Sequence, residues 1–191
     1  MNLPLIDNEE FKNKDFTNNK LPTAEYNECQ FINCNFEASD VSNNSFLECE
    51  FINCNISNGT VKHTIFNDVY FSDCKLVGIQ FYHCNDFLLD FKFSNCILNY
   101  SSFYRLKVNN TKFADCKLQH VDFTETSANN VIFDNCDLKD AIFDQTSLQK
   151  TQFETAFNIS INPTINNLKG AVFSRENCFG LLDSFHVKIK S

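Results

Sequence analysis

Ten cysteines and four histidines are the residues of this chain whose types could support metal binding, disulfide formation or nucleophilic chemistry. Their spacing fits no metal site, because no Cys-x-x-Cys pair is present and the histidines follow no ligand spacing: His63, His83, His120 and His186. The sequence also lacks a phosphate-binding glycine loop, a Gly-x-Ser-x-Gly motif and a His-Glu-x-x-His motif. We therefore predict no catalytic residue, no cofactor and no metal ion, and hence a protein that is not an enzyme.

The cysteines recur regularly instead. Six of them form one column at steps of 20, with a single step of 22: Cys34, Cys54, Cys74, Cys96, Cys116 and Cys136. A free cysteine behaves as a small hydrophobe, which suits an inward position of limited size. Stacked neighbours would lie close enough to form disulfides. The first seven residues resemble no secretory signal, however, so we expect reduced, structural thiols.

Large apolar residues recur at every fifth position between Phe11 and Phe81, and again from Leu88 to Phe153. A step of five would scatter side chains around a helix and place them on alternate faces of a strand. A chain that turns one corner in each unit of five resolves this, and four corners close a square. The expected period of 20 is present, with one two-residue insertion between Phe81 and Leu88, in a column without exception: Phe11, Phe31, Phe51, Phe71, Phe93, Phe113, Phe133 and Phe153. The sequence therefore predicts a solenoid with 20 residues per coil.

The unit itself has a large apolar centre, a small residue two positions earlier and a polar residue between them. Good examples are Cys34-Asn35-Phe36, Val121-Asp122-Phe123 and Cys136-Asp137-Leu138. This pattern resembles the pentapeptide-repeat family over residues 9–173. The resemblance implies an all-β fold, a right-handed quadrilateral parallel β-helix of about seven coils, with a short helical C-terminal cap.

Three segments depart from the repeat. Residues 1–8 are expected to cap the N-terminal end, with Leu3, Leu5 and Ile6 as a lid. Residues 174–191 are expected to form a short helix, with Ser174 as its N-cap, followed by a strand over residues 186–189. Four apolar side chains of this cap would either cover the last coil, or form a homodimer contact, or do both: Phe179, Leu181, Leu182 and Phe185.

The third segment is the break at residues 82–92. Phe91 is too bulky for the small position that it occupies in the repeat, which predicts a local bulge, and Phe87 has no place in the repeat. The break is either a tolerated insertion or a recognition surface.

The net charge of −8 is confined to one half of the chain. Residues 1–86 hold 13 acidic and 5 basic residues, whereas residues 87–191 hold 11 of each. The coil register stacks four carboxylates about 4.8 Å apart, in a line that we call the acidic column: Glu28, Glu48, Asp68 and Asp90. Glu25, Glu37, Asp40 and Glu50 are expected to flank it. The acidic half is either a solvated face or a mimic of the DNA backbone.

This charge argues against direct nucleic-acid binding through a basic patch, and no apolar run is long enough to span a membrane. Some bacterial pentapeptide-repeat proteins resemble DNA in size, shape and charge, bind type II topoisomerases and protect them from fluoroquinolones. The resemblance thus implies a non-enzymatic, cytoplasmic protein that binds DNA gyrase or topoisomerase IV and confers quinolone resistance. The only insertion within this array is two residues long, whereas some resistance proteins carry two long loops. The alternative is a scaffold protein whose partner binds at the break and the cap.

Overall fold

The corners of the solenoid are made by residues in the left-handed conformation. The computed structural model describes residues 3–188, and within them positive φ angles between 50° and 74° recur at intervals of five along most of the chain. Asparagine and aspartate adopt this conformation more readily than other non-glycine residues, and they occupy most of the corners. Asparagine, which is frequent in this sequence, therefore occupies corner positions where glycine, which is scarce, would otherwise be expected.

Between corners, short strands pair in parallel with the strands of the next coil. The smaller sheet has the order β1-β3-β5-β7, and the larger sheet has the order β11-β10-β9-β8-β6-β4-β2. Partners lie 20 residues apart, as in Phe11↔Phe31, except across the break, where Phe71 pairs with Phe93. The strands are β1 (Leu5–Asp7), β2 (Glu10–Lys12), β3 (Glu25–Asn27), β4 (Gln30–Ile32), β5 (Ser45–Leu47), β6 (Glu50–Ile52), β7 (Ile65–Asn67), β8 (Val69–Ser72), β9 (Phe91–Ser94), β10 (Lys112–Ala114) and β11 (Ile132–Asp134).

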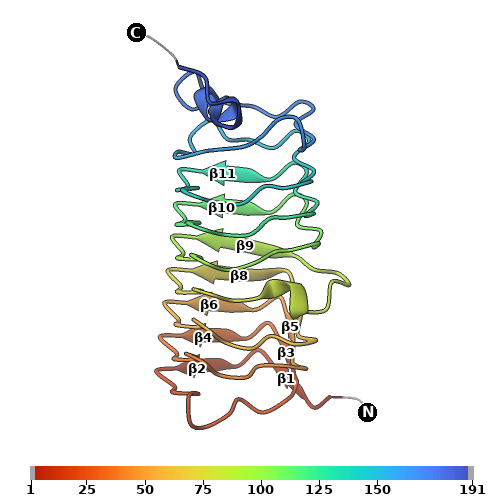
Figure 1. The fold of residues 1–191 in the computed structure, drawn as a ribbon. Coiled ribbons are helices and arrows are strands. Elements are labelled where there is room, and N and C mark those ends of the chain that lie inside the picture. The colour runs from red at the N-terminus through yellow and green to blue at the C-terminus, as the bar shows by residue number, and fades with distance from the viewer. Residues whose placement is uncertain (1–2, 189–191) are drawn as a thin grey trace.

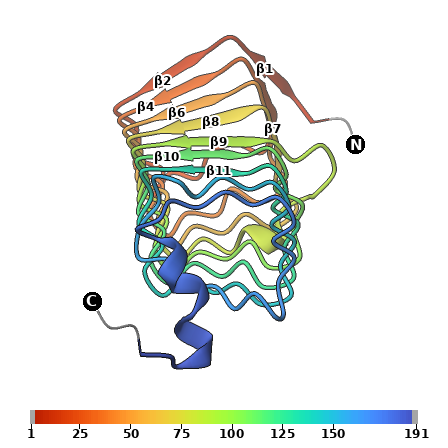
Figure 2. The same ribbon diagram turned by 90° about the horizontal axis from the view of Figure 1, so that it is seen from above.

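The result is an all-β parallel solenoid with almost no helix (Figure 1). Isolated bridges such as Asp15↔Asn35 and Asp40↔Thr60 stack the two remaining sides, so each coil has four faces (Figure 2). The seven strands of the larger sheet are separated by six steps, and regular strand pairing therefore spans about six turns. The predicted count of seven coils is not confirmed. Within residues 3–188 no helix has the length and apolarity needed to cross a bilayer.

Stacked aromatic rings fill the interior. The ring centroids of Phe31 and Phe51 are 4.7 Å apart, and those of Phe93 and Phe113 are 5.0 Å apart, with nearly parallel planes in both pairs. All ten cysteines are free and nine are buried. Seven of the thiols donate to carbonyls of the preceding coil, as from Cys54 Sγ to Phe31 O at 3.2 Å.

The break corrects the predicted interior position of Leu88. This side chain is 61% exposed and its backbone has a φ of 59°, so it forms a projecting corner instead of an inward centre. Phe91 fills the vacated space and is 1% exposed, in register with Val69 of the preceding coil. The predicted bulge lies before it, where the exposed residues 86–88 project from the solenoid after η1 (Phe81–His83) (Figure 1).

Both ends differ from the sequence-based expectation. At the N-terminus Leu5 and Ile6 belong to β1, which pairs with β3 and so extends a sheet; Leu5 is exposed, whereas Ile6 packs against the core. The C-terminal segment forms the two 3-10 turns η2 (Cys178–Leu181) and η3 (Asp183–Phe185), and the predicted helical cap is not confirmed. Residues 186–188 form no strand, and residue 189 of that predicted strand lies outside the described residues.

Candidate partner-binding surface

The acidic column lies along the corner between the two sheets. Glu28, Glu48 and Asp68 have φ angles of 51°, 51° and 52°, and all three side chains are exposed. The backbone N–H of Glu28 donates to Leu47 O at 2.9 Å, which fixes the corner against the next coil. Asp90 continues the column because the β8–β9 pairing of Val69 with Phe91 aligns the residues that precede them. The structure thus places the four predicted positions in one column, with Glu28, Glu48 and Asp68 at left-handed corners and Asp90 at the end of the break.

The fold does not require carboxylates at this corner. The same position is Asn8 in the first coil and Asn110 and Asn130 in later coils, each in the same left-handed conformation. Asparagine tolerates that conformation better than glutamate, and its neutral amide avoids repulsion between like charges on neighbouring coils. Glu28 and Glu48 therefore replace the residue that the backbone favours.

A shallow groove runs beside the upper part of the column, lined by Glu48, Cys49, Glu50, Asp68, Tyr70 and Lys92. Lys92 Nζ lies 2.5 Å from Asp68 Oδ1, and this hydrogen bond raises the pKa of Lys92. Burial raises the pKa of the Cys49 thiol to about 12, so it is no nucleophile at neutral pH. Lys92 offsets part of the negative charge, a contact that the sequence analysis missed because the two residues lie 24 positions apart across the irregular step.

Only two of the four predicted flanking acids adjoin the column. Glu25 lies on β3 and Glu50 on β6, one on each side of the corner. Glu50 accepts a hydrogen bond from Gln30 Nε2 at 2.9 Å.

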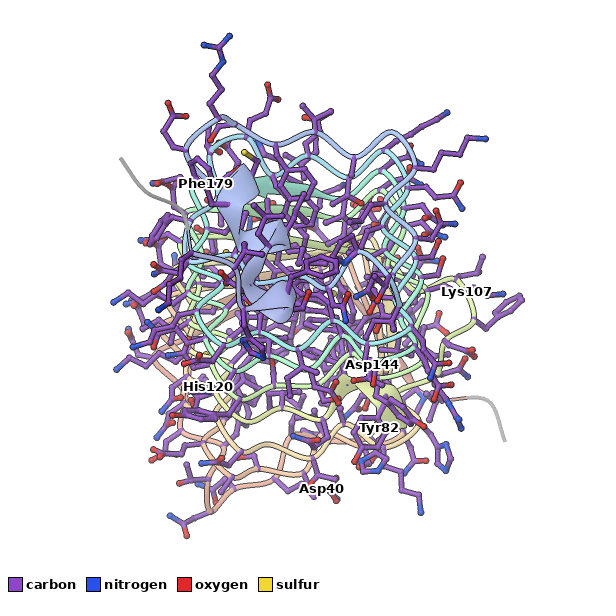
Figure 3. All side chains as sticks on the ribbon, turned by 45° about the horizontal axis from the view of Figure 1, so that its top comes forward. Asp40, Tyr82, Lys107, His120, Asp144 and Phe179 are labelled. Atoms are coloured by element: carbon purple, nitrogen blue, oxygen red, sulfur yellow. The ribbon has the colours of Figure 1, made fainter. Side chains whose placement is uncertain are left out.

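Glu37 and Asp40 lie on the two other faces of the coil, among the N-terminal coils where Figure 3 labels Asp40. Glu37 accepts a hydrogen bond from Asn55 Nδ2 at 3.2 Å. Asp40 pairs with Lys20 at 2.8 Å, and hydrogen bonds from Lys20 and Ser42 lower the pKa of Asp40 to about 2.

Some of the apolar side chains singled out at the break and in the C-terminal segment are exposed. Phe87 is 69% exposed, with its backbone N–H bound to Asn85 Oδ1, and Leu88 beside it was not predicted to be exposed. Phe91 is buried and therefore cannot contact a partner. In the cap, Phe179, Leu182 and Phe185 are exposed, whereas Leu181 packs against the core (Figure 3 labels Phe179).

Residues 3–188 contain no group of three or more metal-ligating side chains that could hold an ion. The family model for the pentapeptide repeat region matches residues 24–87, 44–107 and 85–153. The chain belongs to the pentapeptide-repeat family.

Solved structures of similar fold include QnrB1, a plasmid-mediated fluoroquinolone resistance protein. Two trypsin-treated variants each match this pentapeptide-repeat protein with a TM-score of 0.63. One is 10% identical, with 98% of both chains covered, and the other is 11% identical, with 100% of both covered. Full-length QnrB1 matches with a TM-score of 0.52 and 12% identity, covering 96% of this chain and 100% of its own. At this identity the likeness establishes the fold alone. No curated protein matches the sequence.

Proposed function

We propose that this pentapeptide-repeat protein is a non-enzymatic DNA mimic that binds a bacterial type II topoisomerase through the acidic column. DNA gyrase is the first candidate partner, topoisomerase IV the second, and protection from quinolones in the cytoplasm is the expected result. The observation that carries the proposal is the presence of Glu28 and Glu48 at a corner where Asn110 and Asn130 serve the fold equally well.

The charge density supports the proposal. The coils of β3 and β6 each add two carboxylates near the corner, from Glu25 and Glu28 and from Glu48 and Glu50. At these two levels, two charges per step of about 4.8 Å correspond to one charge per about 2.4 Å, against about 1.7 Å for both strands of duplex DNA; at the next level Lys92 offsets Asp68. A surface that binds the DNA backbone would meet a comparable, slightly weaker row of charge.

The test is a gyrase supercoiling titration with and without ciprofloxacin. The test variant is Glu28→Asn/Glu48→Asn, which removes two charges while installing the residue that the corner favours. The matched control, Glu37→Gln/Asp40→Asn, removes two charges from other faces. We expect the wild type and the control to inhibit or protect gyrase, the test variant to do so much less, and the effect to weaken steeply with salt. No effect of the wild type at large excess refutes the proposal.

A second candidate function is that of a scaffold whose partner binds the break and the cap. The exposed Phe87 and Leu88 favour it, because an insertion with no binding role would be expected to expose polar side chains at its tip. In this case Phe87→Ser/Leu88→Ser abolishes partner binding, and salt has little effect. The apolar cap residues would then form a partner contact or a homodimer contact, which Phe179→Ser/Phe185→Ser disrupts.

A further inference from the structure

One face of the solenoid is divided into an acidic half and a basic half. This face, which we call the divided face, begins with the four-stranded sheet and continues through the bridges Ile65↔Asn85, Lys107↔Ser127, Ser127↔Ser147 and Ser147↔Asn167. Up to the bulge, its strands and corners contain no lysine or arginine and seven acids: Asp7, Glu25, Glu28, Glu48, Asp68, Asp86 and Asp90. Beyond the bulge they contain four bases, namely Arg105, Lys107, Lys150 and Lys169, and the single acid Glu125.

The basic half carries positive charges that are available to bind a partner. Glu125 is held by Arg105, with 2.7 Å between Glu125 Oε2 and Arg105 Nε. Lys107, Lys150 and Lys169 are exposed, and none of them forms an ion pair among residues 3–188 (Figure 3 labels Lys107). Between them lies a neutral surface of hydrogen-bonded amides and hydroxyls, such as Asn129 and Ser147.

The bulge stands at the middle of the divided face. Four levels precede it, those of β1, β3, β5 and β7, and four follow it, those of Lys107, Ser127, Ser147 and Asn167. Phe87 and Leu88 at its tip are 69% and 61% exposed. A two-fold axis through the bulge therefore maps each acidic level onto one level of the other half.

We propose that a second copy of this chain binds the divided face side by side and antiparallel, with the two bulges meeting at the two-fold axis. Glu28 then lies opposite Lys150, and Asp7 lies opposite Lys169, at matching positions along the coil. Asp68, which is paired with Lys92 of its own chain, faces the level of Lys107 but lies three positions farther along the coil. Glu48 lies opposite the neutral level of Ser127. The contact is isologous, because each copy supplies both its acidic and its basic half. A parallel arrangement would set acid against acid, so the charges select the antiparallel one.

This dimer differs from one formed through the cap, and it does not depend on the proposed function. It covers the acidic column, so a partner that binds the column competes with the second copy. The bulges, with Phe87 and Leu88, supply the main apolar contact, and most of the remainder consists of exposed charges and neutral polar groups. Association is therefore weak and strongly dependent on salt.

Sedimentation equilibrium with two charge-reversed variants tests the inference. Lys107→Glu/Lys150→Glu/Lys169→Glu reverses the three lysines of the basic half, and Asp7→Lys/Glu28→Lys/Asp68→Lys reverses three of the seven acids of the acidic half. Lysine is acceptable at the corner of Glu28, because Lys150 occupies the same corner. At about 0.01 M salt, where charges act over about 30 Å, we expect the wild type to dimerise, each variant alone to stay monomeric, and their mixture to form a one-to-one heterodimer.

Three controls make the result specific. Lys75→Glu/Lys117→Glu/Lys139→Glu applies the same charge change to another face and leaves the wild-type dimer intact. Phe179→Ser/Phe185→Ser also leaves it intact, whereas Phe87→Ser/Leu88→Ser at the exposed bulge weakens it at least about tenfold. A wild type that is monomeric at low salt overturns the inference. So does a mixture that fails to associate, or a dimer that only the cap variant disrupts.

Discussion

Phe91 replaces an inward residue that the break removes. Tyr26, Phe46 and Phe66 fill one side of the core in successive coils, but the next residue in register is Asp86, which is exposed. Phe91 comes from the neighbouring position and places its ring centroid 5.4 Å from that of Phe66. It also lies 5.3 Å from Phe81 and 5.4 Å from Phe93, so one side chain bridges three columns of the core.

Truncating this side chain should be costly. Phe91→Ala leaves a cavity among packed rings and is expected to lower the free energy of unfolding by about 3–5 kcal/mol, measured by urea denaturation. Phe87→Ala removes the same atoms from an exposed position and should change it by less than about 0.5 kcal/mol. Equal effects of the two variants would show that Phe91 does not support the core.

The acidic column should lower the free energy of unfolding of the protein. Glu48→Asn relieves a left-handed glutamate and removes one of a row of like charges, and we expect a gain of about 0.5–1 kcal/mol in the free energy of unfolding. Thermal denaturation at low salt measures it, with Asn130→Ala as a control that should destabilise the same corner. A loss of stability in Glu48→Asn would mean that the carboxylate serves the fold, and would remove the main support for DNA mimicry.

The ionisation of Asp40 makes the free energy of unfolding depend on pH. Its folded pKa of about 2 lies below the ordinary value of 3.8, because Lys20 and Ser42 donate to the carboxylate. The stabilisation is therefore complete above about pH 4 and is lost as the pH falls through about 2. Both partners of the ion pair are about half exposed, so solvent screening keeps the contribution below about 1 kcal/mol. Urea titrations of the wild type and Asp40→Asn should converge below pH 2.

At the scale of elements, the side chain of Asn177 is one of the contacts by which the C-terminal turns close the last coil, beside the backbone bond from Ile161 N to Gly180 O. Asn177 Nδ2 donates to Phe153 O at 2.6 Å and to Ala156 O at 2.9 Å, and the backbone N–H of Asn177 donates to Ser174 Oγ. Ser174 is not the N-cap that the sequence predicts, because η2 begins after Asn177; the hydroxyl of Ser174 instead fixes the turn that precedes η2. Gly180 permits the close packing, since a Cβ there would lie 1.9 Å from Ile159 O.

Removing the amide should open this end. Asn177→Ala leaves two carbonyls without their donor and is expected to cost about 1–3 kcal/mol in the free energy of unfolding. Glu176→Ala, which truncates the exposed neighbour, should be close to neutral. Chemical denaturation followed by circular dichroism distinguishes the two, and an unaffected Asn177→Ala protein would mean that the turns only rest on the last coil.

At the scale of the whole molecule, the solenoid is a one-dimensional stack with unequal ends. Each coil contacts only its neighbours, so local stability follows the packing of each coil. The C-terminal end is closed by the turns, whereas the first coil leaves Ile6, Phe11 and Phe16 only partly buried. The strands β1 and β2 each have a partner on one side only.

This asymmetry predicts the order of hydrogen exchange. Amides of β1 and β2 should exchange at least about tenfold faster than those of β6 to β10, because the first coil can open without disturbing the others. Mass spectrometry of peptides from the native protein measures the difference. Uniform protection along the chain would mean that the stack opens as one cooperative unit.

The repeat could be predicted from the sequence because equivalent residues of neighbouring coils are a fixed number of positions apart. A period of five, closed to 20 by four corners, is enough to predict the all-β solenoid, the buried columns of phenylalanine and cysteine, and the alignment of Glu28, Glu48, Asp68 and Asp90. These features depend only on register, which the pattern of inward residues specifies in every coil.

Tertiary structure decided what departs from the period. Only packing across coils determines that Phe91 enters the core while Leu88 leaves it, since both are large and apolar. Likewise, only the arrangement of the four faces separates Glu37 from the acidic column and brings Lys92 to Asp68. The C-terminal turns are set by their close contact with Ile159, because so short a segment has too little helical propensity of its own to choose a conformation.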